Sequence, residues 1–201
     1  MPAPEFSEEI NEIIAKWNAI ERRVKEAEQI CGEAIIPAIN ELRYAGRQFV
    51  DAMAILVQAA KTSEDYQKIE RHLSNVRYNL TNADHDCTDA MCLFLHEKLG
   101  RLFNEYSLPL VFKYFPDYKE CFERMEGANT AITASREDRK NRVATYQAIA
   151  DFHIPRLYEF YNAIILSEPL ILAHQKQLRI RWSVVAAVGV IAASILFFVL
   201  R

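Results

Sequence analysis

Residues 6–34 read FSEEINEIIAKWNAIERRVKEAEQICGEA, and apolar side chains recur there at alternating gaps of four and three residues. This apolar seam consists of Phe6, Ile10, Ile13, Trp17, Ile20, Val24, Ala27, Cys31 and Ala34. A repeat of about 3.5 residues is typical of a helix that packs nearly parallel to its neighbours. The stretch therefore predicts an all-α fold built from long helices that pack side by side.

The helical spacing resumes after the seam. A second helix is expected over residues 37–61, and its buried positions are expected to be Ile39, Leu42, Phe49, Met53 and Leu56. Thr62 and Asp65 have the spacing of a capping box, so they predict the start of a third helix. No proline follows until Pro109, and this helix is expected to reach Tyr106.

Prolines mark the expected interruptions in the second half of the chain. The stretch LPLVFKYFPDY, residues 108–118, is expected to be an ordered non-helical link, because it contains two prolines. Helical spacing resumes at Asp117, a kink is expected at Pro155, and Pro169 is expected to open the last helix. The sequence predicts an elongated bundle of long antiparallel helices, followed by a single C-terminal transmembrane helix.

The last segment, SVVAAVGVIAASILFFVL over residues 183–200, contains no charged residue. Eighteen helical residues cover about 27 Å, which is close to the hydrocarbon thickness of a bilayer. The segment therefore predicts a transmembrane anchor, and the bilayer is an expected partner. Because the segment ends the chain, the span is expected to form after the rest of the chain has been synthesised.

A basic collar over residues 176–182 precedes the apolar segment. It contains Lys176, Arg179, Arg181 and the interfacial aromatic Trp182, whereas Arg201 alone follows the segment. Positive residues stay on the cytoplasmic side, so residues 1–175 are predicted to be a cytoplasmic helical bundle. The N-terminus has no basic start and no apolar run, which argues against a secretory signal, and the expected location is a bacterial inner membrane.

Charge and cysteine content limit the classes of function. All 27 acidic residues precede Pro169, so the body of the chain is acidic and nucleic acid is not an expected partner except at a local site. The four cysteines are expected to be reduced thiols. No Gly-x-Ser-x-Gly motif, phosphate-binding glycine loop or Glu-x-x-His motif occurs, so no enzyme class is indicated and no cofactor is expected.

The densest group of potential ligands begins at residues 84–87, which read Asp-His-Asp-Cys. Asp89, Cys92 and His96 follow at helical spacing and could offer oxygen, sulfur and nitrogen to one zinc ion. No CxxC or HxxxH pair accompanies them, so we favour buried cysteines and a hydrogen-bonded histidine over a metal site. The run from Arg136 to Arg142 could bind a phosphate, but its alternating signs favour a solvated, self-paired face.

A resemblance to a known family arises in the second and third helices. The segments NELRYAGR, residues 40–47, and ERHLSNVRY, residues 70–78, resemble small bacterial helical proteins with HEPN-type folds, including CRISPR-associated accessory proteins that sit in membranes. HEPN ribonucleases carry an Arg followed after four to six residues by a His. Here seven residues separate Arg77 from His85, so the resemblance implies a degenerate site, with Arg71 and His72 as further candidates.

Three functions follow from these features. In the first, the bundle forms a homo-oligomer and gathers several spans, packed through Ala186, Gly189 and Ala193, to act on or gate the membrane, as in bacterial defence. In the second, the chain is a tethered scaffold that recruits a helical protein partner. In the third, which the resemblance alone implies, it is a HEPN-like ribonuclease with an atypical site.

Overall fold

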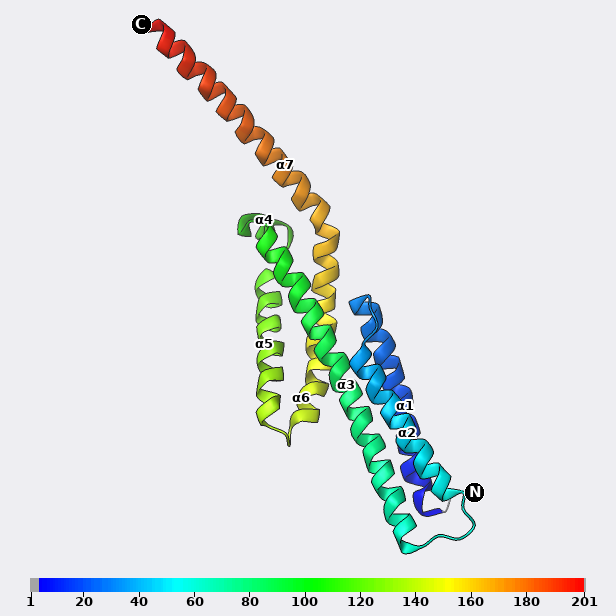
Figure 1. Ribbon diagram of the computed structural model, residues 1–201. Coiled ribbons are helices and arrows are strands. Elements are labelled where there is room, and N and C mark those ends of the chain that lie inside the picture. Colours follow the sequence, from blue (N-terminus) through cyan, green and yellow to red (C-terminus); the bar gives the residue numbers. More distant parts are fainter. Residues whose placement is uncertain (1–3, 201) are drawn as a thin grey trace. The chain divides into compact units, whose positions relative to one another are not determined.

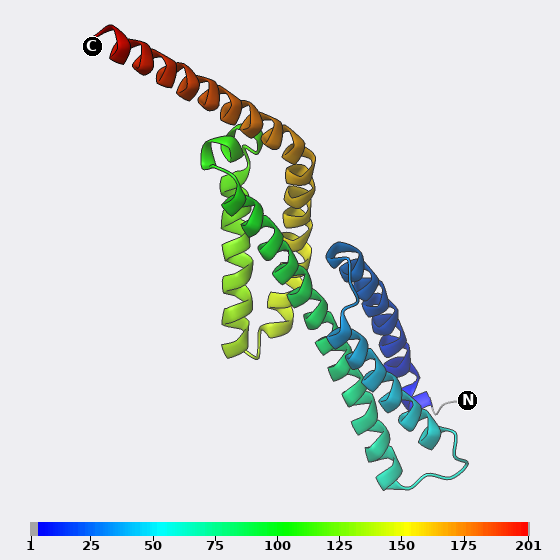
Figure 2. The ribbon, with the colours of Figure 1, turned by 45° about the horizontal axis from the view of Figure 1, so that its top comes forward.

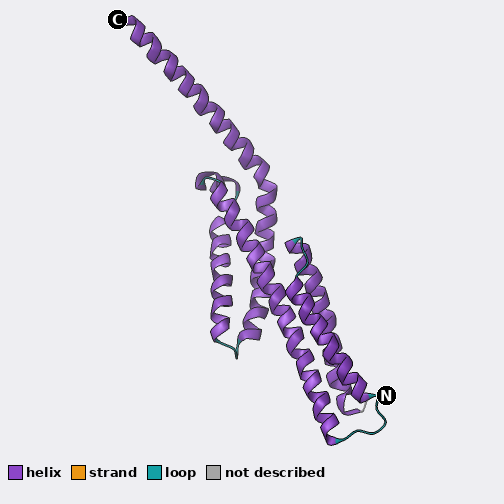
Figure 3. Ribbon diagram, in the orientation of Figure 1, coloured by secondary structure: helices purple, strands orange, loops and turns teal. Residues whose placement is uncertain are grey.

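The computed structural model describes residues 4–200, and within that range it contains helices and no strand (Figures 1 and 3). The helices are α1 (Pro4–Cys31), α2 (Ile36–Leu56), α3 (Ser63–Glu105), α4 (Leu108–Tyr114), α5 (Tyr118–Glu137), α6 (Arg142–Ala148), the π-helical turn η1 (Ile149–His153) and α7 (Ile154–Val199). This confirms the prediction of an all-α helical bundle.

The helices form two compact units. The first contains the chain as far as Glu97 together with Arg124–Tyr158, and the second contains Lys98–Glu123 together with the chain from Glu159 onward. Helices α3, α5 and α7 each contribute residues to both units.

The core of the first unit is formed by the apolar seam of α1 and the matching face of α3. The α1 residues Phe6, Ile10, Ile13, Ile20, Val24 and Ala27 are buried, as are Ile69, Leu73, Val76, Leu80 and Ala83 of α3. In Figures 1 and 2, α1 and α2 lie beside the first part of α3.

The apolar seam ends with α1. There Gly32 has a φ of 73°, a conformation that favours glycine, and Ala34 is exposed beyond the helix. The long third helix is confirmed, and it ends one residue before Tyr106.

Helix α2 buries a different face from the one expected. Its buried residues are Ala38, Ala45, Ala52 and Leu56, whereas Ile39 is exposed and Leu42, Phe49 and Met53 are half-buried. Alanines spaced seven residues apart place a narrow strip against the neighbouring helices, and small side chains allow helix axes to approach closely. Leu56 is buried as expected, whereas the other expected positions were chosen for their large apolar side chains and flank the contact strip.

The stretch expected to be a non-helical link contains α4 instead. Pro109 lies in its first turn, where the missing N–H would have no helical partner, so the proline is compatible with a helix start. Leu110 and Val111 are buried on its inner side. The ring of Phe115, just after α4, packs 5.7 Å from that of Phe160 in α7, measured between centroids. These contacts hold α4 in the second unit.

The two prolines of the last helix lie in different settings. Pro169 lies in the interior of α7 rather than at its start, and it is exposed, so water can reach the carbonyl that its missing N–H leaves unpaired. Pro155 is the second residue of α7 and follows the π-helical turn η1 directly. A widened turn there accommodates a residue that cannot donate the helical hydrogen bond.

Candidate functional site

The C-terminal part of α7 is exposed throughout. Ile164 and Ile171 of the same helix are buried, but every residue from Arg179 to Leu200 is exposed. The helix is long and apolar enough at this end to cross a membrane, and none of its most apolar 18 residues is buried against the rest of the described chain. Among the described residues, these side chains form a continuous exposed apolar run.

The predicted interface and packing residues lie on this exposed part of the helix. Lys176, Arg179 and Arg181 are exposed, and Trp182 has an exposed fraction of 71%. The small residues Ala186, Gly189 and Ala193 are exposed too, and a Cβ added at Gly189 would meet no atom within 4 Å. Arg201 lies outside the described residues.

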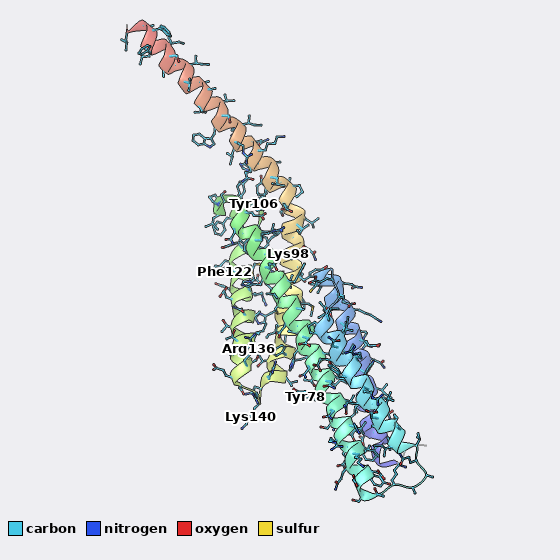
Figure 4. All side chains as sticks on the ribbon, viewed as in Figure 1. Tyr78, Lys98, Tyr106, Phe122, Arg136 and Lys140 are labelled. Carbon is cyan, nitrogen blue, oxygen red and sulfur yellow. The ribbon has the colours of Figure 1, made fainter. Side chains whose placement is uncertain are left out.

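Helix α4 is fastened to α7 immediately before the basic collar. The hydroxyl group of Tyr114 lies 2.9 Å from Nδ1 of His174, and the Lys113 ammonium group lies 3.3 Å from the same nitrogen. In the same unit, the hydroxyl group of Tyr106, which is labelled in Figure 4, donates a hydrogen bond of 2.7 Å to Glu168. Burial and, to a smaller extent, this hydrogen bond raise the pKa of Tyr106 to about 12. Sequence reasoning missed these pairs, because about 60 residues separate the partners and no periodicity links them.

A second group of polar residues lies inside the first unit, along the ligand-rich stretch of α3. The hydroxyl group of Tyr146 in α6 donates to both carboxylate oxygens of Asp89, at 2.9 and 3.1 Å. The carboxylate of Asp84 lies 3.9 Å from Nε of Arg23 in α1. Burial raises the pKa of both carboxyl groups. Together these two pairs, which link α3 to α6 and to α1, make up the partly buried polar cluster of the first unit.

His85 packs against Tyr146 of this cluster and is buried, with an exposed fraction of 5%. Its ring lies 4.1 Å from the Tyr146 ring, and its Nδ1 atom has no hydrogen-bond partner in the described chain. Burial, assisted by the positive charges of Arg142 and Lys16, lowers its pKa to about 4. His85 is therefore neutral at neutral pH, which suits a packing role.

The candidates for a ribonuclease site contact different helices. Arg77 forms an ion pair with Glu9 of α1, whereas His85 packs on Tyr146 of α6. Nδ1 of His72 lies 2.7 Å from the side-chain oxygen of Gln48 in α2, and Arg71 is exposed. The contacts thus do not gather these four side chains into one site.

The three zinc candidates line one cleft of about 230 Å³ in the first unit. Within it, Asp89 is engaged by Tyr146, and burial raises the pKa of Cys92 to about 12, so its thiol stays protonated. Nε2 of His96 lies 4.0 Å from a carboxylate oxygen of Glu126. Residues 4–200 contain no group of three such side chains placed to hold a metal ion.

The charged run of residues 136–142 covers the end of α5, a turn and the start of α6, so it is not the face of one helix, although residues 136–141 are exposed as expected. Arg136 is in the last turn of α5 and Arg142 begins α6, with Lys140 in the turn between them (Figure 4). Asp138 holds the turn by accepting hydrogen bonds from the backbone and side-chain nitrogens of Asn141, at 3.3 and 2.7 Å. An Asx-type turn of this kind ends a helix more readily than it continues one.

An apolar groove on the outer side of α1 and α2 is a further candidate that the sequence did not indicate. It has a volume of about 310 Å³, and its walls include Ile14 and Trp17 of α1 and Gly46, Phe49 and Val50 of α2. A Cβ at Gly46 would lie 3.3 Å from the Trp17 ring, so the glycine lets the two helices meet at the floor of the groove.

These features divide the molecule into an exposed apolar helix end with its collar, a polar cluster in the core of the first unit, and an apolar groove. None of them is a recognisable catalytic site in the part of the chain that the structure describes. No protein-family model, curated protein or solved structure matches the chain.

Proposed function

We propose that the chain is a single-pass membrane protein of the bacterial inner membrane, anchored by residues 183–200, whose cytoplasmic bundle self-associates so that several spans act together on the bilayer. The observation that carries this proposal is the complete exposure of an apolar helix end attached to a bundle in which the apolar faces of α1 and α3 are buried. Exposure of this surface to water would be unfavourable, because complete burial of each Val, Leu, Ile or Phe side chain contributes about 1.5–3 kcal/mol of favourable free energy.

The collar supports the orientation that we propose. Three basic residues and Trp182 lie at the bundle side of the apolar segment, and all are exposed and able to reach lipid headgroups. Each basic residue near an anionic leaflet contributes about 1 kcal/mol of attraction. Positive residues favour the cytoplasmic side, so the bundle is assigned to the cytoplasm.

The composition of the span limits what a group of spans can do. Ser183 and Ser194 are its only polar residues, and in the helix the Ser194 hydroxyl already donates to the Val190 carbonyl at 2.9 Å. A wide aqueous pore needs polar lining, so a narrow hydrophobic gate or a local disturbance of the bilayer fits this span better. The strip of Ala186, Gly189 and Ala193 would let the helices approach closely.

The second candidate function, a tethered scaffold, is favoured by the apolar groove of α1 and α2. The groove has the form that receives the apolar face of an amphipathic helix, and its walls are almost free of polar atoms. In this alternative the anchor serves only to hold the groove near the membrane.

The mass of the detergent-solubilised chain, measured by light scattering, distinguishes the two. The self-association proposal expects a defined oligomer for the full chain, reduced in size for a variant that ends at residue 175. A monomer in both preparations would refute self-association and favour the scaffold. A single helical protein that copurifies in stoichiometric amount, and is lost when Val50 in the groove is replaced by Glu, would establish the scaffold.

A further inference from the structure

We propose that α4 and the turn that follows it form a second membrane-contacting surface, which lies in the headgroup region of the leaflet that the collar touches. This surface, the α4 tip, consists of residues 107–119. The inference rests on the proposed function, because it takes α7 to span the bilayer. Its occupant is a lipid surface that contains anionic headgroups.

The hydrogen bonds of α4 place the tip close to the start of the span. Both Tyr114 and Lys113 contact Nδ1 of His174, and because a lysine ammonium group can only donate, this nitrogen is the acceptor. His174 precedes Ser183 by nine residues, which is about 13 Å along the helix. The collar occupies this interval, so the tip is held at the bundle end of the collar, where headgroups meet water.

The outer side of α4 has the chemistry of an interfacial helix. Leu108 and Phe112 lie four residues apart, on the same side of the helix, and their exposed fractions are 50% and 51%. Leu110 and Val111 fill the inner side, so α4 is amphipathic although it is short. The Phe112 ring is held in position by an edge contact with the Tyr118 ring, at 5.1 Å between centroids. An exposed, fixed aromatic ring and a leucine next to a membrane anchor are suited to the headgroup boundary.

The charges around the tip favour an anionic lipid surface over a protein partner. Lys113 and Lys119 are both exposed, and Asp117 is the only acidic residue among residues 107–119. The ammonium group of Lys119 lies 3.7 Å from a carboxylate oxygen of Glu123 in α5, so its charge is balanced within the protein. Three further basic residues lie in the adjacent collar. Lys113 and the collar thus supply the positive charge beside the apolar side chains of the tip, and anionic headgroups complement this pattern.

The depth of nitroxide labels in the membrane tests the inference on the full chain. Single cysteines replace Leu108 or Phe112 in a Cys31→Ser background, since the other three native cysteines are buried. The chain is reconstituted into vesicles of equal parts phosphatidylcholine and phosphatidylserine. Two reference positions complete the set: Val188 in the proposed span, and the exposed Leu166, which precedes Ser183 by 17 residues, or about 25 Å of helix.

The labels at positions 108 and 112 are expected to be more accessible to oxygen, and less accessible to a water-soluble nickel complex, than the label at position 166. They are expected to be shallower than the label at position 188. If the label at position 188 reports hydrocarbon while those at 108 and 112 match position 166, the inference is overturned and the anchor stands. A label at position 188 that reports water would overturn the proposed function, and the inference with it.

A change of lipid separates lipid contact from burial within the protein, because it leaves the chain unaltered. In vesicles of phosphatidylcholine alone, the label at position 108 is expected to move toward the values of position 166, and the label at position 188 is expected to stay unchanged. An unchanged label at position 108 would mean that protein, not lipid, shields it, and this too would overturn the inference. Two positions, 108 and 112, are labelled because loss of the Phe112 ring also removes its contact with Tyr118.

Discussion

Replacement of His85 by phenylalanine is expected to remove a large part of the acid sensitivity of the first unit. His85 is buried against Tyr146, and its pKa lies near 4 in the folded chain against 6.5 for the free side chain. Between these values the unfolded chain binds a proton that the folded chain does not, so the free energy of unfolding falls as the pH falls from 6.5 to 4.

The size of the effect follows from the two pKa values. A shift from 6.5 to about 4 corresponds to about 3 kcal/mol when the whole window is crossed. Between pH 7 and pH 5 the linkage relation gives a loss of about 2 kcal/mol. Phenylalanine keeps a ring against Tyr146 and does not titrate, so His85→Phe should lose about 2 kcal/mol less than the parent chain over this interval.

Urea unfolding of the detergent-solubilised full chain, followed by circular dichroism at pH 7 and pH 5, measures the difference. The carboxyl groups of Asp84 and Asp89 titrate in both proteins, so the comparison isolates His85. Any overpacking by the larger ring changes the free energy of unfolding equally at both pH values. The variant His85→Gln provides a second side chain that does not titrate. If both variants lose as much stability as the parent between pH 7 and pH 5, the account of His85 as a buried neutral residue is refuted.

Two further predictions concern the core and the helix backbone. Leu80 is fully buried in α3, so Leu80→Ala should lower the free energy of unfolding by about 2–5 kcal/mol. Leu93 is exposed on the same helix, so Leu93→Ala should change it by about 0.5 kcal/mol or less. Equal effects of the two variants in urea unfolding would contradict the assigned faces of α3. An added Cβ at Gly100 meets no atom within 4 Å, so Gly100→Ala should raise the free energy of unfolding by about 0.5–1 kcal/mol. Gly32 has a positive φ, so Gly32→Ala should lower the free energy of unfolding. Thermal unfolding of both variants checks the two signs, and a stabilised Gly32→Ala would show that the end of α1 is wrongly described.

The sequence was informative wherever large apolar side chains recur at helical spacing. The seam of α1, the long α3 and the capping box of Thr62 and Asp65 follow from this pattern, and the box is present with reciprocal hydrogen bonds of 2.9 and 3.2 Å. Composition alone also identified the apolar end of α7.

The sequence was misleading where small residues or prolines decide the structure. The alanines of α2 carry no strong hydrophobic signal, although their size sets the contact strip. Pro109 reads as a helix breaker, but at the first turn of α4 it is well tolerated. The polar cluster around His85 could not be foreseen in its pairing, because Tyr146 and Asp89 meet only when α6 packs on α3.

The claim that residues 183–200 cross the bilayer is central, and alkaline carbonate extraction of membranes from cells that express the chain tests it most directly. The full chain should remain in the membrane pellet, while a variant that lacks residues 183–200 should be released into the supernatant. Release of the full chain by carbonate would contradict the account, because it would show that the apolar end of α7 is covered by protein and not by lipid.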